Sequence, residues 1–195
     1  MHALGQVAGF TLERAIAPDA VARALNARLP GDIRVIGAEE VPADFHPRFV
    51  SQTKTYRYRI WNADVMAPFE RRYAWHIIER LDVEAMTAAA RVLEGRHDFA
   101  AFQAAGGSTK TTERIVSSSV ISRTASEEPL VTYDISGNGF LRYMVRNIVG
   151  TLVEVGRGRR PGEWVAEVLR SRDRASAGPT APPEGLFLVS VQYVG

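Results

Sequence analysis

One guanidinium lies on a segment that is otherwise typical of a buried helix. From Met144 to Gly158, apolar residues recur every four positions in two adjoining rows, which predicts an amphipathic helix with a wide apolar stripe. The rows are Met144, Ile148 and Leu152, and Val145, Val149 and Val153. Arg146 and Asn147 interrupt the polar rim of that stripe. Because a guanidinium near a buried helix is unfavourable unless it meets an acid or a phosphate, Arg146 is the first candidate functional residue.

A second candidate lies in the alternating stretch TKTYRYRIW, Thr53 to Trp61. Its period of two predicts a strand with Tyr56 on one face, beside Tyr58 and Ile60, and with Arg57 and Arg59 on the other. A tyrosine in such a strand usually packs with its hydroxyl at the surface. The alternative is a stacking platform for an unpaired base, with the arginines on phosphates. The sequence by itself favours packing.

Residue spacing gives no support to several other kinds of site. The loop GRGRRPG, Gly156 to Gly162, follows a predicted helix and lacks the Lys-Ser/Thr ending of a phosphate loop, so we interpret it as a helix stop and a basic loop that could contact RNA. No G-x-S-x-G elbow supports acyl transfer. No metal site is expected, because the histidines share no ligand-like spacing: His2, His46, His76 and His97.

Charge is distributed unevenly along the 195 residues, although the net charge is only +2. Basic residues concentrate in Arg48–Arg72 and Arg142–Arg174, which favours a polyanion partner. The alternative is the solvated surface of a protein from a GC-rich gene. The absence of cysteine excludes disulfides and fits a reducing cytoplasm. We expect neither a signal peptide nor a membrane helix.

The predicted elements that must position these residues alternate between helices and strands. Helices are expected at Pro18–Arg28, Val83–Leu93 behind the cap Asp82, Met144–Gly158 and Pro161–Arg170. Strands are expected at Leu4–Thr11, Ile33–Val41, Thr53–Trp61, Tyr73–Ile77, Arg114–Arg123, Leu130–Ser136 and Leu186–Val194, with a turn at Glu127–Pro129. This order predicts an α+β fold, an antiparallel-rich sheet with helices packed on one face.

Six strings, in register over nearly the whole chain, resemble the tRNA pseudouridine synthase A (TruA) family. They are HALGQVAGF (His2–Phe10), NARLPGDIRV (Asn26–Val35), DFHPRFVSQTKTYRYRIWN (Asp44–Asn62), GRHDFAAF (Gly95–Phe102), GNGFLRYMVRNIVGTLVEVGRG (Gly137–Gly158) and APPEGLFLVSVQY (Ala181–Tyr193). The resemblance implies the pseudouridine synthase fold. It also implies two domains, residues 1–46 as the remnant of an N-terminal α+β domain and 47–195 as the C-terminal α+β domain.

The resemblance further implies an RNA-binding, cytoplasmic homodimer that isomerises uridine to pseudouridine in the anticodon stem-loop of tRNA, at positions 38–40. No metal or organic cofactor is implied. The target base is flipped into a pocket and attacked by an aspartate. Tyr56 matches the tyrosine that stacks on the base. Arg146 matches the arginine that pairs with the catalytic aspartate.

One departure concerns the nucleophile. The family carries its aspartate in a loop reading G-R-T-D-x-G-V-H-A, and this chain begins Met1-His2-Ala3, at the last three letters. We expect that the N-terminal half is incomplete, through a mis-called GTG start or a real truncation. We also expect marginal stability in the first 45 residues. The alternative function is a non-catalytic RNA-binding remnant that keeps Tyr56 and the basic blocks.

Overall fold

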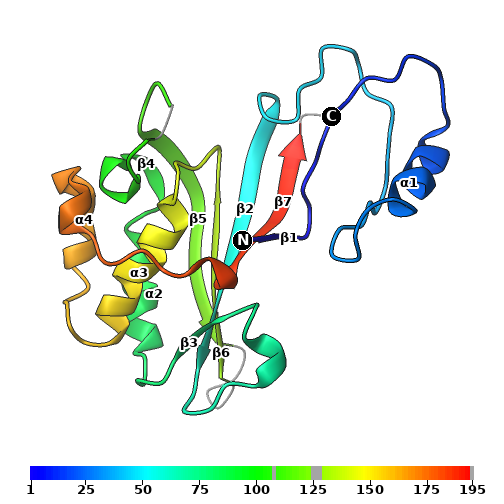
Figure 1. The fold of residues 1–195 in the computed structure, drawn as a ribbon. Coiled ribbons are helices and arrows are strands. Elements are labelled where there is room, and N and C mark those ends of the chain that lie inside the picture. The colour runs from blue at the N-terminus through cyan, green and yellow to red at the C-terminus, as the bar shows by residue number, and fades with distance from the viewer. Residues whose placement is uncertain (107–108, 124–128, 194–195) are drawn as a thin grey trace. The chain divides into compact units, whose positions relative to one another are not determined.

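The computed structural model describes residues 1–106, 109–123 and 129–193 (Figure 1). The chain divides into two compact units. Met1–Gln6 and Ser51–Gly195 form one, called the sheet unit below, and Val7–Val50 form the other, called the small unit. The expected division into domains 1–46 and 47–195 is a statement about ancestry and stays a prediction.

The sheet unit is built on a seven-stranded sheet in the order β1-β7-β2-β6-β5-β4, with β3 paired to β2. The pairings β1–β7 and β2–β3 are parallel, and the others are antiparallel. The strands are β1 (His2–Ala3), β2 (Ser51–Asn62), β3 (Trp75–Ile77), β4 (Gly95–Asp98), β5 (Glu113–Arg123), β6 (Leu130–Gly137) and β7 (Leu186–Tyr193). The predicted turn at Glu127–Pro129 and the end of the last strand at Val194 lie partly or wholly outside the described residues.

Strand β2 is the central element, since it pairs with β6 on one side and with β7 on the other. The alternation of residue types along β2 predicts correctly which of its side chains are buried and which are exposed. Tyr58 and Ile60 are buried, and Arg57, on the opposite face, is exposed. Tyr56 lies on the same face as Tyr58 and packs against the core at its margin.

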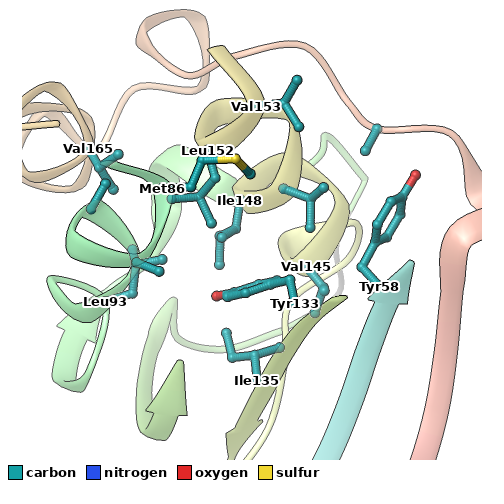
Figure 2. Packing of buried hydrophobic residues seen from close by; sticks show 14 of the residues in the cluster. Tyr58, Met86, Leu93, Tyr133, Ile135, Val145, Ile148, Leu152, Val153 and Val165 are labelled. Atoms are coloured by element: carbon teal, nitrogen blue, oxygen red, sulfur yellow. The ribbon is translucent and has the colours of Figure 1, made fainter. Parts of the chain in front are cut away.

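Three helices gather on one side of this sheet (Figure 1). They are α2 (Val83–Arg91), α3 (Met144–Gly156) and α4 (Trp164–Ser171). The predicted cap of α2 is confirmed, because the Asp82 carboxylate accepts a hydrogen bond from the backbone N–H of Ala85 at 2.9 Å. Figure 2 shows Tyr133 and Ile135 of β6 pointing toward Ile148 of α3 in the shared core. The predicted α+β architecture is confirmed.

Short 3-10 turns connect these elements at Pro68–Glu70, Ala100–Phe102, Arg174–Ser176 and Pro183–Gly185. Within the described residues, no helix combines the length and the apolar character needed to cross a bilayer.

The small unit contains one helix, α1 (Pro18–Asn26), where the sequence predicts Pro18–Arg28. The predicted strand Ile33–Val41 is wrong, because this segment has no strand partner. The predicted strand Leu4–Thr11 is also wrong, and only His2–Ala3 pairs with β7. Asn26 holds the coil after α1 by accepting from the N–H of Val35 at 2.8 Å and donating to its carbonyl at 2.9 Å.

Candidate active site

Arg146 and Glu154 are the two residues of α3 that are not buried. The Glu154 carboxylate is paired with Arg157 and Arg159, each at 3.3 Å. Arg146, by contrast, has no ion pair with any residue that the structure describes. The first turn of α3 therefore carries a positive charge that no acid of the described chain neutralises.

The guanidinium of Arg146 is held at two points. Its Nε donates to the carbonyl oxygen of Ala181 at 2.6 Å, and its central carbon lies 4.8 Å from the centre of the Tyr143 ring. Its terminal amino groups have no hydrogen-bond partner in the described part of the chain. These are the groups with which arginine binds a carboxylate or phosphate.

Asn147, the next residue of α3, fixes the segment that supplies the Ala181 carbonyl. Its side chain is fully buried. Its oxygen accepts hydrogen bonds from the Thr180 hydroxyl at 2.6 Å and from the Arg174 guanidinium at 3.2 Å. Its nitrogen donates to the carbonyl of Phe102 at 2.8 Å. A buried amide with all these partners fixes one geometry for the segment ahead of Ala181.

Gly150 allows that segment to lie directly against α3. A Cβ at Gly150 would overlap the carbonyl oxygen of Pro179, so any other residue would push the segment away. Thr151, the next residue of α3, holds the same segment. Its hydroxyl accepts a hydrogen bond from the backbone N–H of Gly178 at 3.0 Å. The position of Ala181 therefore follows from three successive contacts along α3.

Tyr56 lies half-buried in β2, opposite Ile135 of β6 and Leu188 of β7. Its ring meets the Phe140 ring edge to face, with 5.0 Å between the ring centres. Burial raises the pKa of its hydroxyl, so the phenol stays protonated at neutral pH. A neutral ring of this kind can stack on a nucleobase or donate a hydrogen bond.

Tyr58 connects the two candidates. Its hydroxyl donates to the carbonyl of Pro182 at 2.7 Å, next to the carbonyl that holds Arg146. Burial raises the pKa of this phenol, while the nearby charge of Arg146 acts to lower it. The described residues show no direct contact between Tyr56 and Arg146. Tyr56 nevertheless lies on the same face of β2 as Tyr58, whose hydroxyl binds the Ala181–Pro182 backbone that also holds Arg146.

The β2–β7 ladder is irregular at Tyr56. Thr55 pairs with Ser190 and Tyr56 with Leu188, so Val189 is an extra residue in β7. Such bulges bend a strand, increase its twist and recur beside active sites. Sequence reasoning missed this feature, and also Tyr143 and the Ala181 carbonyl. The string APPEG was the available signal for Ala181.

Several arginines of the basic blocks are paired with acids. The Arg57 guanidinium binds Asp134 through two hydrogen bonds, of 2.7 and 3.0 Å, and Arg59 lies 2.8 Å from Glu70. These acid partners explain why both arginines occur in β2. The phosphate contacts that the stacking hypothesis gave them are therefore not needed.

The loop after α3 has a similar explanation. Arg159 pairs with Glu154 and Glu79, and Arg160 lies over the Trp164 ring at 5.0 Å. A shallow hollow beside this loop, about 460 Å³ in volume, is lined by Asp82, Ala85, Val155 and Gly158–Gly162, and includes neither Tyr56 nor Arg146. No cluster of three or more possible metal ligands is found within the described ranges.

Comparisons with known proteins assign this architecture to a family. Residues 89–194 match the family model described as tRNA pseudouridine synthase. Residues 1–117 also match a model described as an uncharacterized protein conserved in bacteria, which names no activity.

Curated relatives match almost the whole chain. The tRNA pseudouridine synthase A of Myxococcus xanthus is 48% identical over 193 residues, covering 99% of this chain and 72% of the relative. The enzymes of the same name from Pelobacter propionicus and Acetivibrio thermocellus are 46% and 43% identical, each covering 99% of this chain and 78% of the relative. The chain therefore belongs to the tRNA pseudouridine synthase A family, whose members isomerise uridine in tRNA.

Proposed function

We propose that the sheet unit carries the base-stacking and cationic parts of an active site that isomerises uridine in the anticodon stem-loop of tRNA, at positions 38–40. In this proposal Tyr56 stacks on the flipped base, and Arg146 pairs with the nucleophilic aspartate. The observation that carries it is the guanidinium at the first turn of α3, held by Ala181 and without an acid in the described chain.

The proposed reaction moves the ribosyl bond from nitrogen to carbon without a net change in composition. A carboxylate attacks C1′ of the ribose as the C–N glycosidic bond breaks. The base then turns, a bond forms between C1′ and C5, and the carboxylate is released. The proton on C5 leaves to solvent, and N1 gains a proton. Covalent catalysis by a carboxylate benefits from a fixed cation that holds the anion and a ring that holds the base. Arg146 and Tyr56 have the chemistry for these two tasks.

The proposed nucleophile is the aspartate of the family's G-R-T-D motif, a string that does not occur in residues 1–195. Two aspartates within the chain support that assignment by being engaged elsewhere. Asp98 lies 3.2 Å from Arg172, and Asp134 forms its two hydrogen bonds with Arg57. Neither forms an ion pair with Arg146.

RNA binding by this chain, assembly as a homodimer, a cytoplasmic location and independence of metals and cofactors complete the proposal. Binding is supported by exposed arginines that have no acid partner in the described residues: Arg71, Arg72, Arg80, Arg96, Arg142 and Arg170. Phosphate contacts by such residues predict a steep loss of tRNA affinity as salt increases.

The test is tritium release from tRNA labelled at C5 of uracil. The chain is assayed as it stands and also preceded by the N-terminal segment of the Myxococcus xanthus relative. We expect release from the extended form. Arg146→Ala should abolish release while tRNA affinity changes little. Tyr56→Ala should raise the activation free energy by about 1–3 kcal/mol, because stacking on the base is lost.

Arg28→Ala serves as the matched control, because Arg28 is an exposed residue of the small unit and is not among the arginines invoked for RNA binding. Its loss should change neither release nor affinity. Near-normal release from either site variant would remove that residue from the proposal. If both forms bind tRNA in a salt-dependent manner and neither releases tritium, the RNA-binding remnant is the better description.

A further inference from the structure

Tyr143 has an unusual backbone for a large residue. It caps the N-terminus of α3 with φ 61° and ψ 4°, and Arg172 is the other non-glycine residue with positive φ in the described ranges. The left-handed region is unfavourable for aromatic residues, so it persists only where surrounding structure imposes it. Strained residues of this kind concentrate at functional sites.

The Tyr143 ring lies against two guanidiniums. The central carbon of Arg146 is 4.8 Å from the ring centre, and that of Arg142 is 5.3 Å away. Arg142 is anchored elsewhere, because its Nη1 donates to the carbonyl of Ala105 at 3.2 Å. Within the described residues, the Arg146 guanidinium has one other contact, the hydrogen bond to the Ala181 carbonyl. The Tyr143 ring is therefore the second of its two contacts there.

The backbone of Tyr143 begins the helix at the same time. Its carbonyl accepts the N–H of Asn147 at 2.9 Å, so α3 starts at this residue although the side chain makes no capping hydrogen bond. A polar cap such as Ser or Asp is the common choice at this position. Here a tyrosine occupies it, in a strained conformation, with its ring over the arginine of the next turn. Helix capping alone does not explain that choice.

We propose that Tyr143 is a positioning residue, which together with the Ala181 carbonyl holds the Arg146 guanidinium in one orientation before any substrate binds. A guanidinium on a flexible stem loses conformational freedom when it pairs with a carboxylate, and fixing it beforehand removes that penalty from the reaction. The catalytic consequence rests on the proposed function, whereas the orientation of Arg146 is a property of the chain itself.

Three variants separate the effect of the Tyr143 ring from the effect of its backbone conformation. Tyr143→Phe keeps the ring. Tyr143→Asn removes it and suits the left-handed conformation, which asparagine tolerates well. Arg172→Asn is the matched control, since Arg172 has the other positive φ (55°) and pairs with Asp98. Thermal unfolding confirms that each variant folds.

The first readout is the NMR signal of the Arg146 Nε–H group in the 195-residue chain, identified by its loss in Arg146→Lys. Three forms keep an aromatic ring at position 143: the unmodified chain and the variants Tyr143→Phe and Arg172→Asn. In each of them we expect the ring to shift the Arg146 Nε–H signal and this hydrogen to exchange slowly with water. In Tyr143→Asn it should move toward exposed-arginine values and exchange about tenfold faster. An unchanged signal in Tyr143→Asn overturns the proposal, whatever the activity.

The second readout is kinetic, in the form of the chain that releases tritium. Tyr143→Asn should lower kcat about tenfold with KM unchanged, and Tyr143→Phe should restore kcat. A raised KM with unchanged kcat would mean that the ring contacts RNA directly, and it overturns the positioning role. If Arg146→Ala retains activity, the proposed function fails, while the NMR result still decides how Arg146 is held.

Discussion

The two units of this chain contain similar kinds of residues and differ in what those residues contact. In the sheet unit, apolar side chains from β2, β6 and the three helices form one buried cluster. In the small unit, every residue of which is described, none is buried. Its large apolar side chains are exposed, with Ile36 at 90% and Phe49 at 75%.

This difference shows that apolar residues give a core only where several elements surround them. One helix and two coil segments cannot bury the side chains they carry, and segments of this size rarely fold by themselves. The expected marginal stability of the first 45 residues is consistent with this exposure and remains to be measured. The candidate site, by contrast, lies in the sheet unit, where packing holds each group in place.

The largest expected difference between the units comes from a glycine-to-alanine substitution in each of them. Gly150→Ala should lower the free energy of unfolding of the sheet unit by about 3 kcal/mol or more, because the new Cβ overlaps the Pro179 carbonyl. Urea unfolding followed by tryptophan fluorescence measures it. Gly37→Ala, in the small unit, is the control, since its Cβ would have nothing within 4 Å. Equal effects of the two substitutions would contradict the contrast.

A second comparison uses the same residue type in both units. Asn147→Ala should lower the free energy of unfolding by about 2 kcal/mol, because buried partners at Thr180, Arg174 and Phe102 lose their hydrogen bonds. Asn26→Ala also removes two hydrogen bonds, both to Val35, but in a part-buried place. It should leave the main transition within about 0.5 kcal/mol. A comparable loss from Asn26→Ala would show that the small unit contributes to the cooperative core.

The smallest expected effect concerns Asp98, whose pKa is lowered by hydrogen bonds from Thr112 and Ala100 and by the Arg172 charge. A carboxylate with a lowered folded pKa stabilises the fold above its ordinary value of 3.8, and this contribution disappears as pH falls through the folded pKa. Asp98→Asn should therefore cost about 1 kcal/mol at pH 7 and progressively less in acid.

Urea unfolding at pH 7 and at pH 3 measures the change for Asp98→Asn. Asp44→Asn should change nothing at pH 7, because Asp44 is an exposed residue of the small unit whose carboxylate has no hydrogen bond or ion pair within the described residues. A loss for Asp98→Asn that stays constant between the two pH values would assign the effect to packing rather than to charge.

The sequence predicts those parts of the fold that depend on local pattern. The alternation around Tyr58 and Ile60, the cap Asp82 and the apolar rows of α3 each involve neighbours a few residues apart, and all three are confirmed. The strand predicted at Ile33–Val41 failed because a strand needs a hydrogen-bonding partner, which an apolar run does not guarantee.

The candidate site could be predicted by residue type but not by arrangement. Arg146 was identifiable as a cation on an apolar helix. Its two contacts were not, because one is a backbone carbonyl at Ala181 and the other depends on a left-handed φ at Tyr143. Asp134 as the partner of Arg57 and Glu79 as one partner of Arg159 were equally hidden, since each comes from a distant part of the chain.

The central position of β2 has a consequence for how the molecule is made. Tyr56 in this strand pairs with Ile135 and Leu188, so neither neighbour exists when β2 leaves the ribosome. Contacts between such distant residues slow folding, because the entropy of closing a long loop is lost before the strand pairing stabilises the chain. Strand β7 is synthesised after β6 and completes the pairing beside Tyr56, so the nascent chain must remain soluble until β7 has emerged.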